Sequence, residues 1–313
     1  MPLPPVADRP REARPAARQA TREVSFKMEL SRARQLMLLA STILSNSYFG
    51  TISAKSINTN ALKGGCVPFL NCYACPSALF SCPIGALQHF STIRAIPYYL
   101  IGFLGLVGLT VGRMACGWLC PFGFLQDLMY KIRSPKFLIP DYFKYFKYLV
   151  LLVLVIVLPY ITGETTFSMI CPAGTLTAGI PWALWNPVNP ETGFPVFSTG
   201  QGGMFFVSLG ILIAFLIWFV LAKRPFCRTT CPMGAIFSFF NKFSMVRLEV
   251  GKGCDGCNIC QEICPVDLNV PLECNSGECI RCLECTKCSH VSIVTPFSTT
   301  NRGFIKNGRP NEL

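Results

Sequence analysis

The C-terminal third of the chain contains the most specific chemical pattern, a closely spaced run of cysteines. The stretch CDGCNICQEICP sets four of them at the spacing C-x2-C-x2-C-x3-C-P: Cys254, Cys257, Cys260 and Cys264. At this spacing three thiolates bind one [4Fe-4S] cluster, and the fourth leads into a helix and binds a neighbouring cluster. Four thiolates can also bind zinc, but the register and the terminal proline favour iron and sulfide.

A second run of cysteines, CIRCLECTKCSH, follows the first and departs from its spacing, because the expected fourth position is Ser289 and no proline follows. The fourth cysteine of each run binds the cluster of the other run, so the predicted ligand sets cross over. The sets are Cys254, Cys257, Cys260 and Cys288 for one cluster, and Cys264, Cys279, Cys282 and Cys285 for the other. Because the spacing is shifted by one residue, the assignment of Cys288 as the fourth ligand is open, and Cys274 is the alternative.

Four more cysteines each begin the sequence Cys-Pro-x-Gly: Cys82, Cys120, Cys171 and Cys231. Two of these motifs extend backwards to C-x3-C-P, which adds Cys116 before Cys120 and Cys227 before Cys231. The short and the extended motif alternate along the chain, so the sequence predicts an internal duplication of two halves. In membrane proteins built from such repeats, the functional site usually lies at the interface between the repeats.

The composition of this motif indicates what it could do. A proline suits the first turn of a helix because its missing N–H group costs nothing there, so each cysteine is predicted to lie at a helix N-terminus. The free N–H groups and the helix dipole lower the pKa of a thiol and stabilise negative charge, and a thiolate-bound iron–sulfur cluster is such an anion. The glycine would let the backbone approach a bulky cluster. The alternative is that each Cys-Pro pair only starts a buried helix.

Apolar segments around these motifs predict how they are positioned. Of 313 residues, 51 % are hydrophobic and 14 % are charged, which is too apolar for an ordinary soluble domain. Four apolar runs lie at about 33–52, 96–115, 146–163 and 203–222. The third and fourth approach the ~20 residues that cross a ~30 Å hydrocarbon core, whereas the first two are richer in Ser, Thr and Gly, and the first could be an interfacial helix. The predicted fold is an α-helical integral membrane protein with about four transmembrane helices and further short or re-entrant helices.

Charges beside the apolar runs predict the orientation in the membrane. Lys and Arg flank the first run, the second run and the fourth run, whereas the connection 164–202 contains none. Because cytoplasmic loops carry an excess of Lys and Arg, we expect a multi-pass protein of a cell inner membrane with both termini on the cytoplasmic side. An inner set then comprises Cys116, Cys120, Cys227 and Cys231, and an outer set comprises Cys72, Cys75, Cys82 and Cys171. Cys66 is left over on the outer side, where a Cys66–Cys72 disulfide is the alternative because that face can be oxidising.

The predicted cofactors are [4Fe-4S] clusters, one for each set of four cysteines and up to four in all. No C-x-x-C-H motif is present for covalent haem, and two histidines, His89 and His290, cannot hold a pair of bis-His haems. No Rossmann or P-loop glycine pattern predicts a nucleotide site. The net charge of +12 is concentrated in the N-terminal segment and beside the apolar runs, where it fits membrane lipid rather than nucleic acid.

The predicted domains follow from these segments. Residues 1–28 are expected to form a disordered basic tail, because they are rich in Pro, Arg and Ala with few large apolar residues. Residues 29–244 form the membrane domain with the repeats, 245–298 a ferredoxin-like domain with two [4Fe-4S] clusters, and 299–313 a flexible tail. The C-terminal domain is expected to have the α+β fold of the bacterial two-cluster type.

Together these motifs resemble those of the NapH/CcoG/NosR-related membrane-bound ferredoxin-type proteins. The resemblance rests on NCYACP…SCPIGALQ, CGWLCPFGFLQDL and RPFCRTTCPMGAI, and it covers about residues 30–295. It implies electron transfer between membrane quinol or an outer-face partner and redox proteins on the cytoplasmic side. It leaves the partner open, because such proteins serve several pathways.

The predicted function is a membrane-embedded iron–sulfur relay between a cytoplasmic-side redox partner and quinone or an outer-face acceptor. The partner could be a soluble ferredoxin, a flavoprotein or a membrane complex, and the lack of an evident acid–base constellation favours an electron-transfer subunit over a self-sufficient enzyme. One hop across ~30 Å of hydrocarbon would be too slow, so the inner and outer sets should lie deep on re-entrant helices, or a quinone should bridge them. The alternatives are a maturation or metal-reducing assembly factor for another membrane redox complex, and an anchor whose clusters only hold the fold together.

Overall fold

The structure is a computed structural model, and it describes residues 17–51, 58, 60–185, 202–251, 254, 259–288, 290–296 and 304–305. Within them, the helices before Cys171 are α1 (Ala17–Ser45), η1 (Ala61–Gly64), α3 (Pro83–Thr92), α4 (Tyr98–Thr110), α5 (Met114–Trp118), α6 (Pro121–Met129), η2 (Asp141–Tyr145), α7 (Phe146–Val150), η3 (Leu151–Val157), α8 (Leu158–Thr162) and α9 (Thr166–Ile170). The helices after it are α10 (Pro172–Gly174), η4 (Thr175–Gly179), α11 (Ile180–Trp185), α12 (Gly202–Leu221), α13 (Pro225–Thr229), α14 (Pro232–Phe240), α15 (Ile259–Glu262), α16 (Val270–Glu273) and η6 (Glu284–Lys287). The strands are β1 (Arg247–Gly251), β2 (Val291–Val294) and β3 (Phe304–Ile305).

Among the residues that the structure describes, two helical stretches are long and apolar enough to cross a membrane: Asp141–Thr162, which joins η2, α7, η3 and α8, and Gly203–Leu221 in α12. They correspond to the third and fourth predicted runs. Helix α4, in the second run, has 13 residues, which at ~1.5 Å per residue cover about 20 Å of a ~30 Å core. The first run lies mostly in α1, which begins at Ala17, inside the segment that the sequence assigns to the tail. Length and composition therefore support two spans, and four spans remain a prediction.

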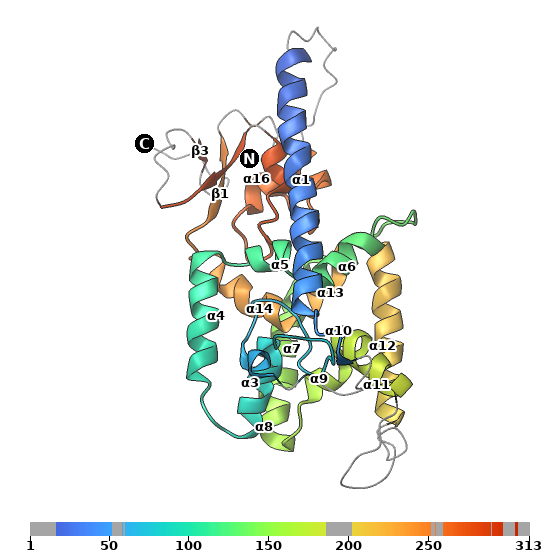
Figure 1. Ribbon diagram of the computed structural model, residues 1–313. Coiled ribbons are helices and arrows are strands. Elements are labelled where there is room, and N and C mark those ends of the chain that lie inside the picture. Colours follow the sequence, from blue (N-terminus) through green and yellow to red (C-terminus); the bar gives the residue numbers. More distant parts are fainter. Residues whose placement is uncertain are drawn as a thin grey trace.

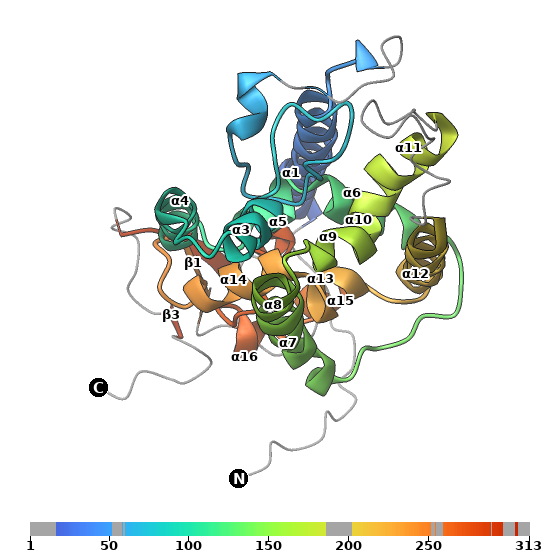
Figure 2. The same ribbon diagram turned by 90° about the horizontal axis from the view of Figure 1, so that it is seen from below.

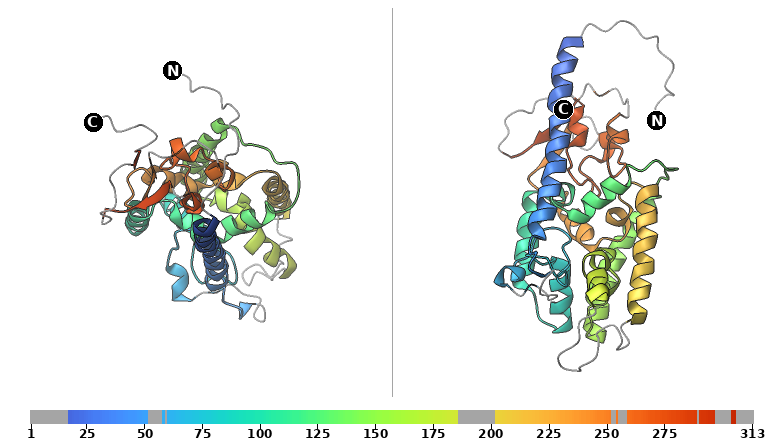
Figure 3. Two further views of the ribbon diagram at one scale, coloured as in Figure 1. Left: turned by 90° about the horizontal axis from the view of Figure 1, so that it is seen from above. Right: turned by 45° about the vertical axis from the view of Figure 1, so that its right-hand side comes forward.

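The longer helices surround the short ones. Figures 1 and 3 show α1, α4 and α12 roughly parallel, with the stretch from α7 to α8 among them. Seen along these helices, the short helices α3, α10 and α14 lie between them (Figure 2). Because these short helices follow Cys-Pro motifs, the structure holds the motifs inside the array of longer helices.

Each of the four Cys-Pro motifs starts a helix, as the sequence predicts. The prolines occupy the first helical turn of α3, α6, α10 and α14, and the cysteine before each proline is the N-cap, with an extended backbone. An extended N-cap followed by proline is the expected geometry, because proline fixes its own φ near the helical value and disfavours a helical conformation of the residue before it. The four thiols are thus presented in the same local conformation.

The C-terminal region contains a small antiparallel sheet with the strand order β2-β1-β3. Strand β1 pairs with β2 so that Leu248 lies opposite Ile293, and its end at Gly251 pairs with β3 at Phe304. The cysteine runs lie between β1 and β2 in the chain, with α15, α16 and η6 among them. Figure 1 shows this sheet at the same end of the molecule as the start of α1.

The buried core is continuous across the membrane region and the C-terminal region. One cluster of buried side chains extends from Leu100 in α4 through Phe226 in α13 to Val291 in β2. It contains ten of the predicted ligand cysteines, including Cys82, Cys120 and Cys264, beside the aliphatic and aromatic residues. The C-terminal region is therefore packed against the membrane region.

Candidate iron–sulfur sites

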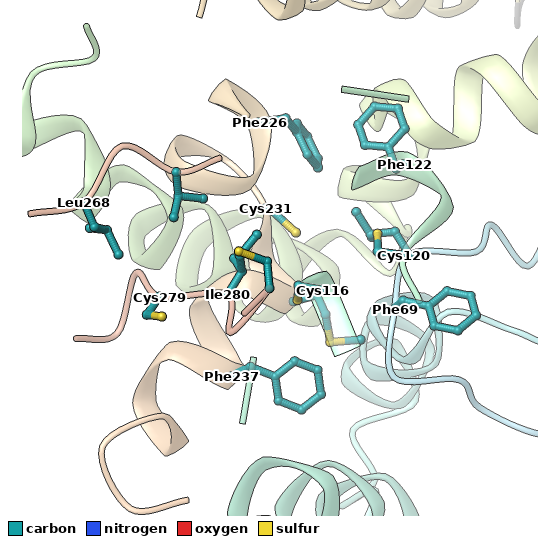
Figure 4. Packing of buried hydrophobic residues seen from close by; sticks show 14 of the residues in the cluster. Phe69, Cys116, Cys120, Phe122, Phe226, Cys231, Phe237, Leu268, Cys279 and Ile280 are labelled. Carbon is teal, nitrogen blue, oxygen red and sulfur yellow. The ribbon is translucent and has the colours of Figure 1, made fainter. Parts of the chain in front are cut away.

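The inner set comes together in the middle of the molecule. All four of its cysteines are buried, with Cys116 and Cys120 delivered by α5 and α6, and Cys227 and Cys231 by α13 and α14. Figure 4 shows Cys116, Cys120 and Cys231 around one space, with Phe226 and Phe122 on one side and Phe237 on the other. Two cysteines from each repeat thus face a shared site, as the duplication predicts.

Backbone N–H groups face the sulfurs at the N-termini of the short helices. The N–H of Gly234 donates to Cys231 Sγ at 3.4 Å. In the other three motifs the backbone N–H groups of the corresponding glycines, Gly85, Gly123 and Gly174, favour the thiolate of the cysteine three residues before them. This contribution acts to lower the pKa of each thiol. The motif therefore aims the backbone at each sulfur, as predicted.

Burial nevertheless outweighs these N–H groups. It raises the pKa of the Cys82 thiol to about 12, and burial together with the neighbouring Cys227 and Cys116 raises that of Cys120 to about 12. The expectation of a lowered thiol pKa is therefore wrong for the bare protein, because desolvation disfavours the thiolate. A cationic iron–sulfide core fits such a donor set, since it supplies the positive charge that buried thiolates require.

Two buried arginines cross between the repeats at the inner set. Arg224 donates from Nη1 to the carbonyl oxygen of Cys116 at 2.9 Å, and Arg113 donates from Nη2 to that of Cys227 at 3.2 Å. Each arginine lies three residues before the first cysteine of its own C-x3-C-P motif. The two repeats therefore exchange the same contact.

The motif glycines make room for these arginines. A Cβ at Gly123 would lie 3.3 Å from Arg224 Nη1, and a Cβ at Gly234 would lie 3.1 Å from Arg113 Nη2. The sequence predicted that these glycines allow close approach to a cluster. In the structure their close neighbours are the guanidinium of the opposite repeat and the carbonyl oxygen of the first cysteine of their own motif, Cys116 or Cys227.

Partly buried carboxylates balance the arginines. Arg224 donates to both oxygens of Asp127 at 2.6 Å, and Arg34 also pairs with this carboxylate. Burial would raise the pKa of Asp127, but Arg224 and Arg34 together hold it below its usual value. On the other side, Arg113 pairs with Glu278 at 3.3 Å.

Three cations that flank apolar runs in the sequence, and were expected at the membrane surface, are therefore internal. Arg113 and Lys147 are fully buried, and Arg224 is 1 % exposed. Lys147 pairs with Glu278 of the C-terminal region. The signal for the two arginines was present in the sequence, since both repeats read Arg-x2-Cys-x3-Cys-Pro.

The outer set is brought together in part. Cys72, Cys82 and Cys171 line one cavity. Cys75 lies close by, where its thiol contacts the side chains of Asn46 at 3.7 Å and Ser77 at 3.4 Å. Three predicted ligands thus share a cavity, and the fourth is their neighbour.

Cys66 stands apart from this cavity. It is half-buried, its backbone bridges to Ser81, and burial alone raises the pKa of its thiol. Both Cys66 and Cys72 carry free thiols, so the structure holds the outer set without the alternative disulfide.

In the C-terminal region one of the two crossed sets is complete. Cys264, Cys279, Cys282 and Cys285, the C-terminal set from here on, line a single cavity. Cys274 also borders it, but its thiol donates to the carbonyl oxygen of Leu248 in β1 at 3.5 Å.

The other crossed set is placed only in part. Cys260 is buried and close enough to Cys285 that its thiolate helps to raise the pKa of that thiol. Cys254 and Cys288 are half-buried. Cys257 lies outside the described residues, so the site as a whole remains a prediction.

In the part of the chain that the structure describes, no three His, Cys, Asp or Glu side chains converge closely enough to bind a single metal ion. The thiols instead border cavities.

A close backbone contact joins the C-terminal set to the inner set. A Cβ on Gly117 would lie 2.5 Å from the carbonyl oxygen of Ile280, so only glycine permits this approach. Trp118 Nε1 donates to the carbonyl oxygen of Arg281 at 3.1 Å. Gly117 follows Cys116, and Ile280 and Arg281 lie between two cysteines of the C-terminal set, so the two sites are neighbours.

Two glutamines beside the cysteine sets were not predicted from the sequence. Gln126 is fully buried and donates from Nε2 to Cys227 Sγ at 3.1 Å. Gln88 occupies the same position of its motif, six residues after the cysteine, and donates to Ser168 Oγ at 3.0 Å. The shared sequence C-P-x-G-x-L-Q was the available signal.

Comparison with known proteins agrees with this duplicated arrangement. Two separate stretches, residues 95–140 and 204–250, match the family described as a 4Fe-4S binding domain. Each stretch contains one C-x3-C-P pair and the apolar helix before it. The chain belongs to the ferredoxin-type 4Fe-4S binding proteins that include NapH and MauN. Membership in this ferredoxin-type family implies iron–sulfur electron transfer.

Relatives of this ferredoxin-type family match most of the chain. An uncharacterized protein of Methanocaldococcus jannaschii is 31 % identical over 214 residues, which are 65 % of this chain and 80 % of the relative. The ferredoxin-type protein NapH of Haemophilus influenzae is 25 % identical over 75 % of this chain and 73 % of its own length. The methylamine utilization ferredoxin-type protein MauN of Paracoccus denitrificans is 28 % identical over 53 % of this chain and 54 % of its own length. No solved structure matches the chain.

Proposed function

We propose that this protein is a membrane-embedded relay that carries single electrons between a redox protein on the cytoplasmic side and quinone or another acceptor at the outer face. The observation that carries the proposal is the order of the thiol sets along the molecule. In Figure 1 the elements of the inner set lie between the C-terminal region at one end and the elements of the outer set, α3 and α10, towards the other. When bound at such sites, [4Fe-4S] clusters supply one-electron transfer.

The proposed ligand sets are those that the sequence predicts, with up to four clusters in all. Buried thiols, N–H groups aimed at sulfur and the paired arginines support the inner set. A shared cavity supports Cys72, Cys82 and Cys171, with Cys75 as the nearest fourth ligand. The same reasoning supports the C-terminal set, and the set with Cys254, Cys257, Cys260 and Cys288 rests on its motif alone.

The proposed location is a cell inner membrane, with four spans and both termini in the cytoplasm. Two helices of sufficient length and hydropathy support membrane insertion. The start of α1 and the C-terminal sheet lie at the same end of the molecule, as an even number of spans requires (Figure 1). In this orientation the C-terminal region would meet soluble partners.

At the outer end, a second cavity supports quinone as the exchange partner. Cys72 borders both the cavity of the outer set and this neighbouring cavity of about 520 Å³, a size typical of small-molecule sites. Its wall combines apolar and aromatic side chains such as Met169 and Trp182 with hydroxyl groups such as those of Thr165 and Ser208. A quinone matches this lining, because its flat ring is lipophilic and its two carbonyl oxygens accept hydrogen bonds.

The experiment is electron transfer in vesicles that contain the purified full chain and a quinone analogue. Reduced ferredoxin or flavodoxin is added outside, and quinone reduction is followed by absorbance. Ala183 is half-buried on the wall of the quinone cavity, so Ala183→Phe should block quinone reduction and leave the iron content unchanged. The control is Leu184→Phe, at a neighbouring side chain that is 79 % exposed.

Cys82→Ser should also stop quinone reduction, but by removing the outer cluster and about four irons. Quinone reduction at the parent rate in Cys82→Ser would refute the relay. If Ala183→Phe reduces quinone at the parent rate, this cavity is not the quinone site, and the outer set has another acceptor.

A further inference from the structure

Arg281 is a buried cation without a carboxylate partner. It lies between Cys279 and Cys282 of the C-terminal set and is fully buried. The other buried cations that the structure describes each pair with a carboxylate: Arg34, Arg113, Lys147 and Arg224. The described partners of the Arg281 guanidinium are all uncharged. Because a buried charge without a counter-charge is costly, an anion is expected beside it.

Two of the three nitrogens of this guanidinium are fixed by the membrane region. Nη1 donates to the carbonyl oxygen of Val111 at 3.2 Å and to the hydroxyl of Ser244, and Nη2 donates to the carbonyl oxygen of Asn241 at 2.6 Å. Gly112 leaves room for this arrangement, because a Cβ there would lie 2.7 Å from Nη1. The head of the side chain is therefore held in one orientation from outside its own cysteine run.

The third nitrogen, Nε, is buried and has no hydrogen-bond partner in the described part of the chain. Buried N–H groups nearly always have a partner, so an unpaired one calls for an acceptor. Arg281 also lines the cavity that the four thiols of the C-terminal set border, and apart from Arg281 and the cysteines the lining residues are aliphatic. An anionic group held by these thiols would supply both the missing acceptor and the missing counter-charge.

The backbone at Arg281 has a conformation that suits glycine better than arginine. Its φ of +47° lies in the left-handed region, which residues other than glycine seldom adopt and which costs free energy. A glycine would remove this cost but would lose the guanidinium. Strain of this kind is common at functional sites, and here it accompanies an unpaired donor and an unbalanced charge on the same side chain.

We propose that Arg281 is the counter-charge and hydrogen-bond donor of the [4Fe-4S] cluster bound by the C-terminal set, with its Nε–H on sulfur and its orientation set by the membrane region. The inference rests on the proposed function only in requiring a cluster at this set. Reduction adds one electron, taken from the redox partner, while no bond breaks at Arg281 and its protons stay in place. A positive charge and an N–H···S contact both stabilise the more negative, reduced state. Docking of the C-terminal region on the membrane region therefore sets the potential of this cluster.

The test is potentiometric EPR of the anaerobically purified full chain, in which the signal of this cluster is the one that Cys282→Ser removes. Arg281→Met should lower the ratio of reduced to oxidised C-terminal cluster roughly tenfold at a fixed potential, the size expected for one hydrogen bond to a charged group. That is about 59 mV for one electron. Arg281→Lys keeps the charge and should keep most of the potential. The control is Arg247→Met, at an exposed arginine that contacts the same Ser244 and whose charge is screened by solvent.

Two further measurements test the hydrogen bond and the orientation. In pulsed EPR after exchange into D2O, the reduced C-terminal cluster of the parent should show one exchangeable proton more than that of Arg281→Lys, because lysine has no donor at the position of Nε. Ser244→Ala removes one anchor of Nη1, so it should lower the same ratio by less than tenfold with iron content retained. Its matched control is Ser238→Ala, a likewise buried serine whose hydroxyl bonds to Ala235 and Tyr148 instead.

The assignment is overturned if Arg281→Met shifts the C-terminal potential no more than Arg247→Met does, or shifts the inner cluster equally. It is also overturned if Arg281→Lys loses as much potential as Arg281→Met or keeps the exchangeable proton, or if the two serine variants behave alike. Failure of the relay is a different result. A parent that lacks the C-terminal cluster would defeat the proposed function together with this assignment, whereas a parent that has it and does not depend on Arg281 would defeat the assignment alone.

Discussion

Arg224 donates a hydrogen bond from Nη1 to the carbonyl oxygen of Cys116 at 2.9 Å, across the boundary between the two repeats. Arg113 makes the reciprocal contact with Cys227. Each guanidinium is buried and hydrogen-bonded to the backbone of a predicted ligand cysteine. Each is partly balanced by a carboxylate, Asp127 or Glu278. The inner set therefore has a more cationic surrounding than a bare thiol site would have.

Loss of one of these charges should make the inner cluster harder to reduce. Arg224→Met is expected to lower its reduction potential, because a nearby positive charge favours the more negative reduced state. Arg224→Lys should keep most of the potential while losing the two-pronged contact with Asp127. Potentiometric EPR measures both, with Arg133→Met, at an exposed arginine, as the control. Equal potentials in Arg224→Met and in the parent would show that the arginine only supports the fold.

The contact between Gly117 and Ile280 should be sensitive to a single methyl group. In Gly117→Ala the new Cβ would lie 2.5 Å from a backbone oxygen, so the C-terminal region must shift, at a cost of ~1–3 kcal/mol. We expect faster hydrogen exchange in residues 279–283 and slower reduction of the inner cluster from the C-terminal side. The control is Gly105→Ala in α4, where a Cβ would meet nothing within 4 Å. Equal exchange in the two variants would contradict the docked arrangement.

The open choice between Cys288 and Cys274 also becomes testable. Cys274 is held by Leu248 and Asn275 next to the C-terminal set, which already has four thiols. We therefore expect Cys274→Ser to retain all iron and Cys288→Ser to lose about four irons, those of one cluster. Iron analysis of both variants decides the question, and the reverse pattern would make Cys274 the ligand.

The sequence predicted the local features of the sites well. Proline after Cys82, Cys120, Cys171 and Cys231 constrains the chain locally, so the four helix starts could be placed from the sequence alone. The grouping of the inner set also followed from the sequence, because its four cysteines flank apolar runs on the same side. The cavity that joins Cys264 to the second cysteine run agrees with the crossing of ligands between the two runs.

The charge network could not be predicted in the same way. Arg113 and Glu278 are 165 positions apart, and an arginine beside an apolar run has the same sequence signature whether it faces lipid headgroups or a partly buried carboxylate. The position of Arg281 likewise depends on a hydrogen bond to Val111, 170 positions away. Such contacts depend on how the helices pack, which local spacing does not encode.

The most direct test of the relay is the iron and sulfide content of the anaerobically purified full chain, read together with its EPR spectrum after reduction. A four-cluster relay would contain about sixteen irons per chain, from four clusters of four, with magnetic interaction between neighbouring reduced clusters. About eight irons confined to the C-terminal region, or zinc in place of iron at the inner set, would contradict it.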